Sequence, residues 1–136
     1  METCSFFIEN KAMFGSYPTQ ETVKLLETKG VRYFVNLTFN NETKILPYNS
    51  AYECIHFPIP DKGVPINILV FSQFIYKLCD ILTNSHQGEM MYIHCKGGHG
   101  RSGIVVACIL AQLFNLDSLI ALEKTSIYHA NRTVMR

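Results

Sequence analysis

Apolar residues fall into short runs along this chain, and polar or glycine-containing breaks separate the runs. Short continuous apolar runs favour buried strands, whereas apolar residues spaced three and four positions apart favour helices. Strands are therefore predicted at Ser5–Ile8, Lys11–Phe14, Val31–Leu37, Tyr52–Phe57 and Met90–Ile93. Helices are predicted at Gln20–Lys29, Ile66–Thr83 and Ile104–Leu110, with a further helix after Asp117.

Residues at the ends of these segments are typical of helix caps. Thr19 is expected to cap the helix at 20–29, and Gly30 is expected to end it in the conformation with φ > 0. Asp117 is expected to cap the last helix, whose apolar side chains are expected to pack inward; these are Leu119, Ile120, Leu122 and Ile127. The order helix, glycine, strand predicts a parallel α/β arrangement.

Two polar segments are predicted to be loops. Thr38–Ser50 carries asparagines and Pro47, so it is interpreted as a connection between strands. Pro58–Pro65 contains three prolines, which exclude both a helix and a central strand. The second segment must be a shaped loop, and it contains Asp61.

The ten residues His94–Gly103 join the strand at 90–93 to the helix at 104–110. Gly97, Gly98 and Gly100 allow backbone N–H groups to turn inward, and the N-terminus of the following helix adds its dipole. A strand, a glycine-rich loop and a helix start are how proteins build an anion site. The loop is predicted to hold a phosphate-like dianion.

Cys95 and Arg101 stand at the two ends of this loop, with five residues between them. Converging N–H dipoles and a guanidinium both favour a cysteine thiolate, so Cys95 is predicted to be a nucleophile at neutral pH. Arg101 can offer two parallel N–H bonds to a phosphoryl group, a geometry that lysine cannot reproduce. Ser102 is placed to donate its hydroxyl proton towards the sulfur.

Composition limits the alternatives. A chain of 136 residues with 48% hydrophobic content is expected to form one domain, 1–136. A net charge of +1 gives no overall field towards nucleic acid or anionic membrane, and no apolar stretch approaches the roughly 18 residues of a membrane span. Five cysteines without regular spacing argue against a disulfide framework and against a zinc site.

The sequence His94-Cys95-x5-Arg101-Ser102 resembles the signature of the cysteine-dependent protein tyrosine phosphatase superfamily, in its small dual-specificity branch. Three further segments resemble that branch at its usual spacing: Gly15–Pro18, Phe34–Thr38 and His56–Asp61. The resemblance extends over most of the chain. It implies a central, mostly parallel sheet flanked by helices, with the site loop at the carboxyl edge of the sheet.

The resemblance also implies roles for the site residues. Cys95, Arg101, Asp61 and Ser102 correspond to the catalytic set, in which the aspartate protonates the leaving oxygen and then activates water. Substrate binding is assigned to Lys96, Gly97, Gly98, His99, Gly100 and Arg101, although Lys96 and His99 are equally compatible with solvated side chains. His94 is expected to support the loop by hydrogen bonding to backbone. No cofactor and no metal are expected.

Other readings stay open at this point. The loop alone fits a phosphate-binding loop with an incidental thiol, or a rhodanese-like or arsenate-reductase-like sulfur loop. Asp61 also suits a turn, Tyr17 and Phe14 fit either a pocket wall or the core, and Cys54 fits either a disulfide partner for Cys95 or a small buried residue. The chemistry also fits a phosphoinositide or RNA 5′-phosphate phosphatase, or a catalytically weak phosphate-binding module.

The expected substrate is a phosphoprotein, because the segments that should line the mouth contribute few cations: Lys62, Lys96 and a mostly neutral His99. A monomer without a nucleic-acid partner is expected, in the reducing cytoplasm, with the nucleus as the alternative. Members of this branch usually carry one more helix after the last predicted here, so a missing C-terminal helix is expected.

Overall fold

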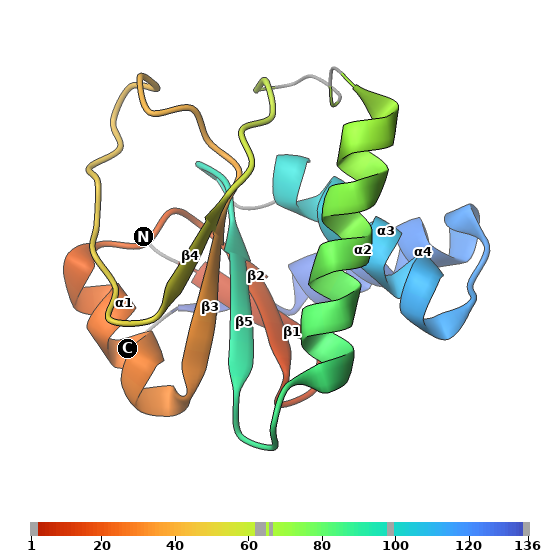
Figure 1. The fold of residues 1–136 in the computed structure, drawn as a ribbon, viewed down its shortest axis with the longest axis horizontal. Helices are drawn as coiled ribbons and strands as arrows, with labels where there is room; N and C mark the ends of the chain where they lie inside the picture. The colour runs from red at the N-terminus through yellow and green to blue at the C-terminus, as the bar shows by residue number, and fades with distance from the viewer. Residues whose placement is uncertain (1–2, 62–64, 66, 98–99, 135–136) are drawn as a thin grey trace.

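The computed structural model describes residues 3–61, 65, 67–97 and 100–134. Within them, one sheet has the strand order β4-β3-β5-β2-β1-β6 (Figure 1). The strands are β1 Thr3–Ile8, β2 Ala12–Gly15, β3 Val31–Asn36, β4 Glu53–His56, β5 Met90–His94 and β6 Thr133–Val134. The helices are α1 Gln20–Lys29, α2 Ile68–Asn84, α3 Gly100–Phe114 and α4 Ser118–Ala130.

The sheet is mostly parallel, as predicted. β3 pairs in parallel with both β4 and β5, and β5 pairs in parallel with β2. β1 forms the predicted antiparallel hairpin with β2, and Asn10 in its turn has φ 59°. The short strand β6 was not predicted; it pairs antiparallel with β1 and extends that edge of the sheet.

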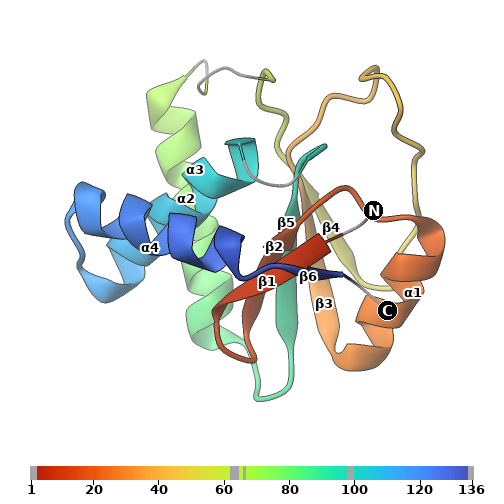
Figure 2. The ribbon, with the colours of Figure 1, turned by 180° about the vertical axis from the view of Figure 1, so that it is seen from behind.

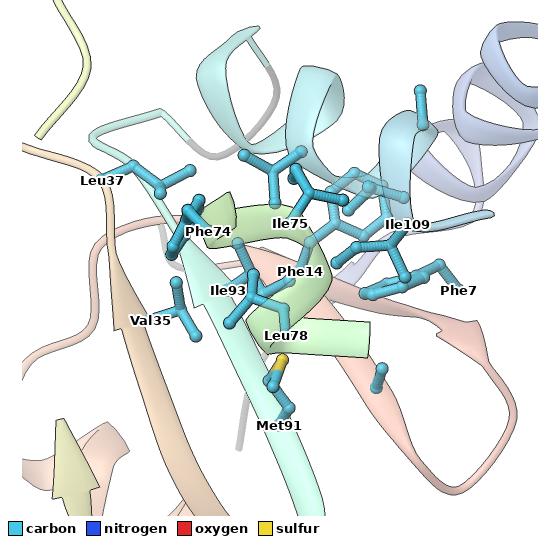
Figure 3. Packing of buried hydrophobic residues seen from close by; sticks show 14 of the residues in the cluster. Phe7, Phe14, Val35, Leu37, Phe74, Ile75, Leu78, Met91, Ile93 and Ile109 are labelled. Carbon is cyan, nitrogen blue, oxygen red and sulfur yellow. The ribbon is translucent and has the colours of Figure 1, made fainter. Parts of the chain in front are cut away.

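Helices cover both faces of the sheet. α1 lies on one face, and α2, α3 and α4 lie on the other (Figures 1 and 2). The larger core lies between the sheet and the three helices; it includes Phe7, Phe14, Leu37, Phe74, Leu78, Ile93 and Ile109 (Figure 3). A smaller core lies under α1 and includes Val23, Leu26, Phe34 and Tyr92. Both faces of β5 are therefore buried, which explains its continuous apolar run.

The predicted caps are present. The side chain of Thr19 accepts a hydrogen bond from the Thr22 backbone N–H, and Gly30 ends α1 with φ 116°. A Cβ at Gly30 would lie 2.3 Å from the Gly88 carbonyl oxygen, so this position requires glycine for space as well as for conformation. Asp117 caps α4 by accepting from the Ile120 N–H. These local signals place the helix ends correctly because they act within one turn.

The predicted inward face of α4 is wrong. Leu119, Ile120, Leu122 and Ile127 are all exposed, and the buried residues of this helix are Ala121 and Thr125. α4 packs against α3 through small side chains: Thr125 Cγ2 lies 3.8 Å from where a Cβ at Gly103 would be. Apolar residues around much of the helix gave no single stripe, so periodicity could not identify the packed face.

No helix in the described parts of the chain has the length and apolar character that a membrane crossing requires.

Candidate active site

Cys95 follows directly on the carboxyl end of β5, where the chain turns towards α3. Its side chain is buried, with 3% of the residue exposed, and Sγ lies 3.7 Å from Ser102 Oγ in the first turn of α3. The strand-to-helix junction predicted for this segment is therefore confirmed. Gly98 and His99 lie outside the described residues, so the inward-turned N–H groups of the whole loop remain a prediction.

Arg101 is buried beside Cys95 and makes a two-pronged ion pair with Glu42. Nη1 lies 2.7 Å from Oε2, and Nη2 lies 2.9 Å from Oε1. Glu42 belongs to the connection between β3 and β4, which thus reaches the start of α3. The Arg101 hydrogen bonds hold the pKa of Glu42 below its ordinary value, and Glu42 raises the pKa of Arg101. Two parallel bonds of this kind fix the plane of the guanidinium.

The loop after β4 supplies two more contacts to Arg101. Nη1 donates to the Ile59 carbonyl at 3.0 Å, and Nη2 lies 3.7 Å from Asp61 Oδ1. We call these four residues, Glu42, Ile59, Asp61 and Arg101, the Arg101 cluster. The Asp61 side chain is 65% exposed, in contrast to the buried guanidinium. The loop containing Asp61 is therefore brought to Arg101, with the carboxyl group accessible from solvent.

His94 lies beneath the loop in an aromatic environment. It is fully buried, and its Nε2 lies 2.7 Å from the Tyr48 hydroxyl. The rings of Tyr17, Tyr48 and Tyr92 have their centroids 4.8, 5.5 and 5.7 Å from the imidazole. Burial lowers the pKa of His94 to about 3, so the ring is neutral at physiological pH. The expected supporting role fits, with a tyrosine hydroxyl as the partner.

Lys96 occupies the next loop position and is tied to the same β3–β4 connection. Its Nζ lies 3.2 Å from Thr43 Oγ1, and its carbonyl accepts from the Tyr17 backbone N–H at 3.2 Å. The side chain is half-buried, so it is neither fully solvated nor free. Tyr17 lies at the site against His94, whereas Phe14 is a core residue with no exposed surface.

The proposed pairing of Cys54 with Cys95 does not suit the sheet. Cys54 lies on β4, and β3 separates β4 from the strand that leads to Cys95. Two strand spacings amount to about 9.5 Å, which exceeds the roughly 7 Å that a disulfide tolerates between Cα atoms. Cys54 is also exposed rather than buried, and none of the five cysteines is in a disulfide.

Glu42 and Tyr48 are site residues that sequence reasoning missed. Both lie in the segment interpreted only as a connection, and their partners are 59 and 46 positions away in the chain. Nothing in the local pattern marked them. No group of histidine, cysteine or carboxylate side chains suited to a metal occurs among the described residues.

Comparisons with known proteins identify relatives of this chain. A protein of Invertebrate iridescent virus 6 that is named as a tyrosine phosphatase is 43% identical over 94% of this chain and 52% of its own length. The Arabidopsis thaliana phosphatidylglycerophosphate phosphatase PTPMT2 is 32% identical over 85% of this chain and 51% of its own length. The chain thus spans about half the length of the curated relatives it matches.

Solved structures give the same fold. Tk-PTP in its active form superposes with a TM-score of 0.79 at 23% identity, covering 98% of this chain and 88% of that one. Human DUSP28 gives a TM-score of 0.69 at 17% identity, covering 93% and 81%. The family described as "Swiss Army Knife protein, DSP-PTPase phosphatase domain" matches residues 1–135. The chain belongs to this dual-specificity-type family of cysteine-dependent phosphatases.

Proposed function

We propose that this protein hydrolyses phosphate monoesters of proteins, phosphotyrosine first and phosphoserine or phosphothreonine as well, through a phosphocysteine intermediate. One observation carries the proposal. A buried cysteine, a serine hydroxyl 3.7 Å away and an arginine held by a carboxylate pair meet where β5 ends, with Asp61 at the solvent side of the same arginine. Nucleophile, anion ligand and proton donor are the three parts that the reaction needs.

In the first step, the Cys95 thiolate attacks phosphorus. An S–P bond forms while the bond from phosphorus to the leaving oxygen breaks, and the proton of Asp61 passes to that oxygen. Arg101 and the N-terminus of α3 hold the phosphoryl oxygens, where negative charge must be stabilised in the transition state. The products of this step are a free alcohol or phenol and the phosphocysteine.

In the second step, water attacks the phosphocysteine. Asp61, now a carboxylate, removes a proton from the water as the new P–O bond forms and the S–P bond breaks. The electron pair returns to sulfur, and the Ser102 hydroxyl donates a hydrogen bond to the departing thiolate. Inorganic phosphate then leaves, and the enzyme returns to its starting state without a cofactor or a metal.

The charges at the mouth favour a phosphoprotein. Glu42 and Asp61 of the Arg101 cluster are acidic. Lys96, next to the nucleophile in the chain, makes a hydrogen bond with Thr43. Binding to an anionic lipid surface uses several free Lys or Arg side chains near the pocket, each worth about 1 kcal/mol. The viral relatives that are named as tyrosine phosphatases support the same substrate class.

A lipid phosphate monoester is the second candidate. The Arabidopsis relative is named for phosphatidylglycerophosphate, and a structural neighbour, PTPMT1, was solved with PI(5)P. The same two chemical steps would act on such a headgroup, with Lys96 as the cation nearest to the nucleophile in sequence. The rest of the proposal is a monomer in a reducing compartment such as the cytoplasm, consistent with five cysteines outside any disulfide.

A substrate panel tests the proposal on the intact chain. We expect kcat/KM on phosphotyrosyl peptides to exceed that on soluble short-chain phosphoinositides and phosphatidylglycerophosphate by at least about tenfold, or roughly 1.4 kcal/mol. A lipid preference that Lys96→Ala abolishes would promote the second candidate. Cys95→Ser is the matched variant: it should bind vanadate but turn over no substrate, and near-wild-type turnover would exclude the covalent route.

A further inference from the structure

Arg132 places a second guanidinium against the loop of the nucleophile. It stands between α4 and β6, and its Nη1 donates to the Gly97 carbonyl at 3.4 Å. The pairing of Cys4 with Thr133 holds this end of the chain against β1. The last described segment of the protein is thereby brought to the loop that β5 supplies from the middle of the sequence.

A phenylalanine ring holds this guanidinium in place. The Arg132 Cζ lies 4.7 Å from the centroid of the Phe14 ring, on β2. β2 is the parallel neighbour of β5, and Phe14 pairs with Ile93 there. Cation–π contact of this kind attracts a guanidinium to the ring face and is stronger where water is excluded.

The charge of Arg132 has no acidic partner among the described residues. Its Nε and Nη2 are buried and make no hydrogen bond there. Burial lowers the pKa of Arg132, and electrostatic attraction to Tyr92, Cys95 and Cys4 opposes that effect. A guanidinium remains charged in proteins, so a half-buried positive charge lies against the loop that carries Cys95.

Arg101 differs in this respect, because its charge is compensated. Glu42 takes two of its N–H groups, and Asp61 lies 3.7 Å from Nη2. The Glu42 carboxylate therefore offsets most of the positive charge that Arg101 presents to an adjacent thiolate. A second guanidinium at this loop would add positive potential to that of Arg101 and of the N-terminus of α3.

We propose that Arg132 is a positioning residue of the active site, which holds the loop through the Gly97 carbonyl and stabilises the Cys95 thiolate with its uncompensated charge. This inference rests on the proposed function, since it concerns the same nucleophile. Three charged or titratable groups interact electrostatically with Cys95 or Arg132: Cys4 on β1, Tyr92 on β5 and Arg101 on α3. Glu42 and Asp61 contact Arg101, and His94 and Lys96 flank Cys95 in the chain.

The test measures the thiolate directly rather than turnover. Alkylation of Cys95 by neutral iodoacetamide is followed against pH by peptide mass, which separates it from the exposed Cys54. Arg132→Met keeps an unbranched side chain and removes the charge. We expect the midpoint of the alkylation profile to rise by about 1 pH unit in Arg132→Met, and Arg132→Lys to restore most of that shift.

Arg32→Met is the matched control. Arg32 is also a half-buried arginine stacked on a ring, 4.0 Å from the centroid of Tyr52, but it lies at the amino end of β3, whereas Cys95 follows the carboxyl end of the parallel strand β5. The midpoint of the Cys95 alkylation profile in Arg32→Met should equal that of wild type. If the role of Arg132 is purely structural, Arg132→Met and Arg132→Lys should lose thermal stability to a similar extent. The midpoints of their alkylation profiles should then be the same.

The outcomes distinguish this inference from the proposed function. An unchanged midpoint in folded Arg132→Met overturns the inference and leaves a phosphatase that depends on Cys95. Turnover by Cys95→Ser overturns the covalent mechanism, whatever the alkylation profile of Arg132→Met. If Arg132→Met does not fold, Arg132→Lys decides: its midpoint must stay within about 0.3 pH unit of wild type, and a rise of 1 unit counts against a role for charge.

Discussion

Two arginines approach the loop of the nucleophile, and their environments are opposite. Arg101 is fixed by Glu42 and by the Ile59 carbonyl, so its plane is set and its charge is compensated. Arg132 has a single carbonyl contact and a ring stack, with no carboxylate partner in the described part of the chain. We infer different roles from this difference: Arg101 would orient the phosphoryl group, and Arg132 would stabilise the thiolate.

The first test of this difference between the two arginines concerns Arg101. If Arg101 acts through its geometry, Arg101→Lys keeps the charge at this position but loses the two parallel bonds to Glu42. We then expect kcat/KM to fall by roughly 10²–10³. Arg132→Lys should lose less than tenfold under the same conditions. Steady-state kinetics on an aryl phosphate measures both variants. Equal losses in the two lysine variants would show that the arginines do not differ in kind.

Asp61 tests whether the carboxylate on Arg101 is catalytic or merely part of the cluster. Asp61→Asn removes the proton donor, and the loss should be about 10² with a phosphotyrosyl peptide, whose leaving group is basic. An ester of a strongly acidic phenol departs without protonation, so its rate should change little. A series of aryl phosphates with graded leaving groups measures this dependence. Losses that do not vary along the series would make Asp61 a turn residue beside Arg101.

Substitution of Glu42 should have the smallest effect on the rate and a specific effect on the charge near Cys95. Glu42→Gln leaves Arg101 uncompensated, so the midpoint of Cys95 alkylation should fall by about 0.5 pH unit. Arg132→Met moves the same midpoint in the opposite direction. Loss of the fixed guanidinium plane should lower kcat/KM by about tenfold or less. A rise of the midpoint in Glu42→Gln would contradict the compensation argument.

The same variant has a defined effect on stability. The pKa of Glu42 is held below its ordinary 4.5, so its contribution to stability is complete above pH 4.5 and is lost as the pH falls through the lower folded value. The free energy of unfolding of the wild type should exceed that of Glu42→Gln by roughly 1.5–3 kcal/mol at pH 7. Denaturant unfolding at pH 7 and pH 3 checks that the difference shrinks in acid; a constant difference would exclude the ion pair as its source.

Features that depend on neighbouring residues were predictable from the sequence. Thr19, Gly30 and Asp117 mark helix ends within one turn, and the segment from β5 to α3 carries its cysteine, arginine and serine together. Asp61 became identifiable through the resemblance of its loop to a known family. Its place beside Arg101 is a tertiary fact that the structure supplies.

Features that depend on distant contacts were not predictable. Glu42 and Tyr48 reach the site from a segment without periodicity. Strand β6 has two residues, too few for a strand pattern. The packed face of α4 is defined by Ala121 and Thr125, because small side chains let α4 approach α3, while its larger apolar residues face outward. Hydrophobicity alone ranks those residues in the reverse order.

The pairing of β1 with β6 has a kinetic consequence. Thr3 and Cys4 pair with Val134 and Thr133, so this contact closes a loop of nearly the whole described chain. Contacts of such long range carry a large entropic cost of loop closure, so they form late in folding. Arg132 directly precedes β6, so the second cation reaches Cys95 only as the fold is completed. During refolding, the reactivity of the thiol should therefore lag behind the recovery of helical structure.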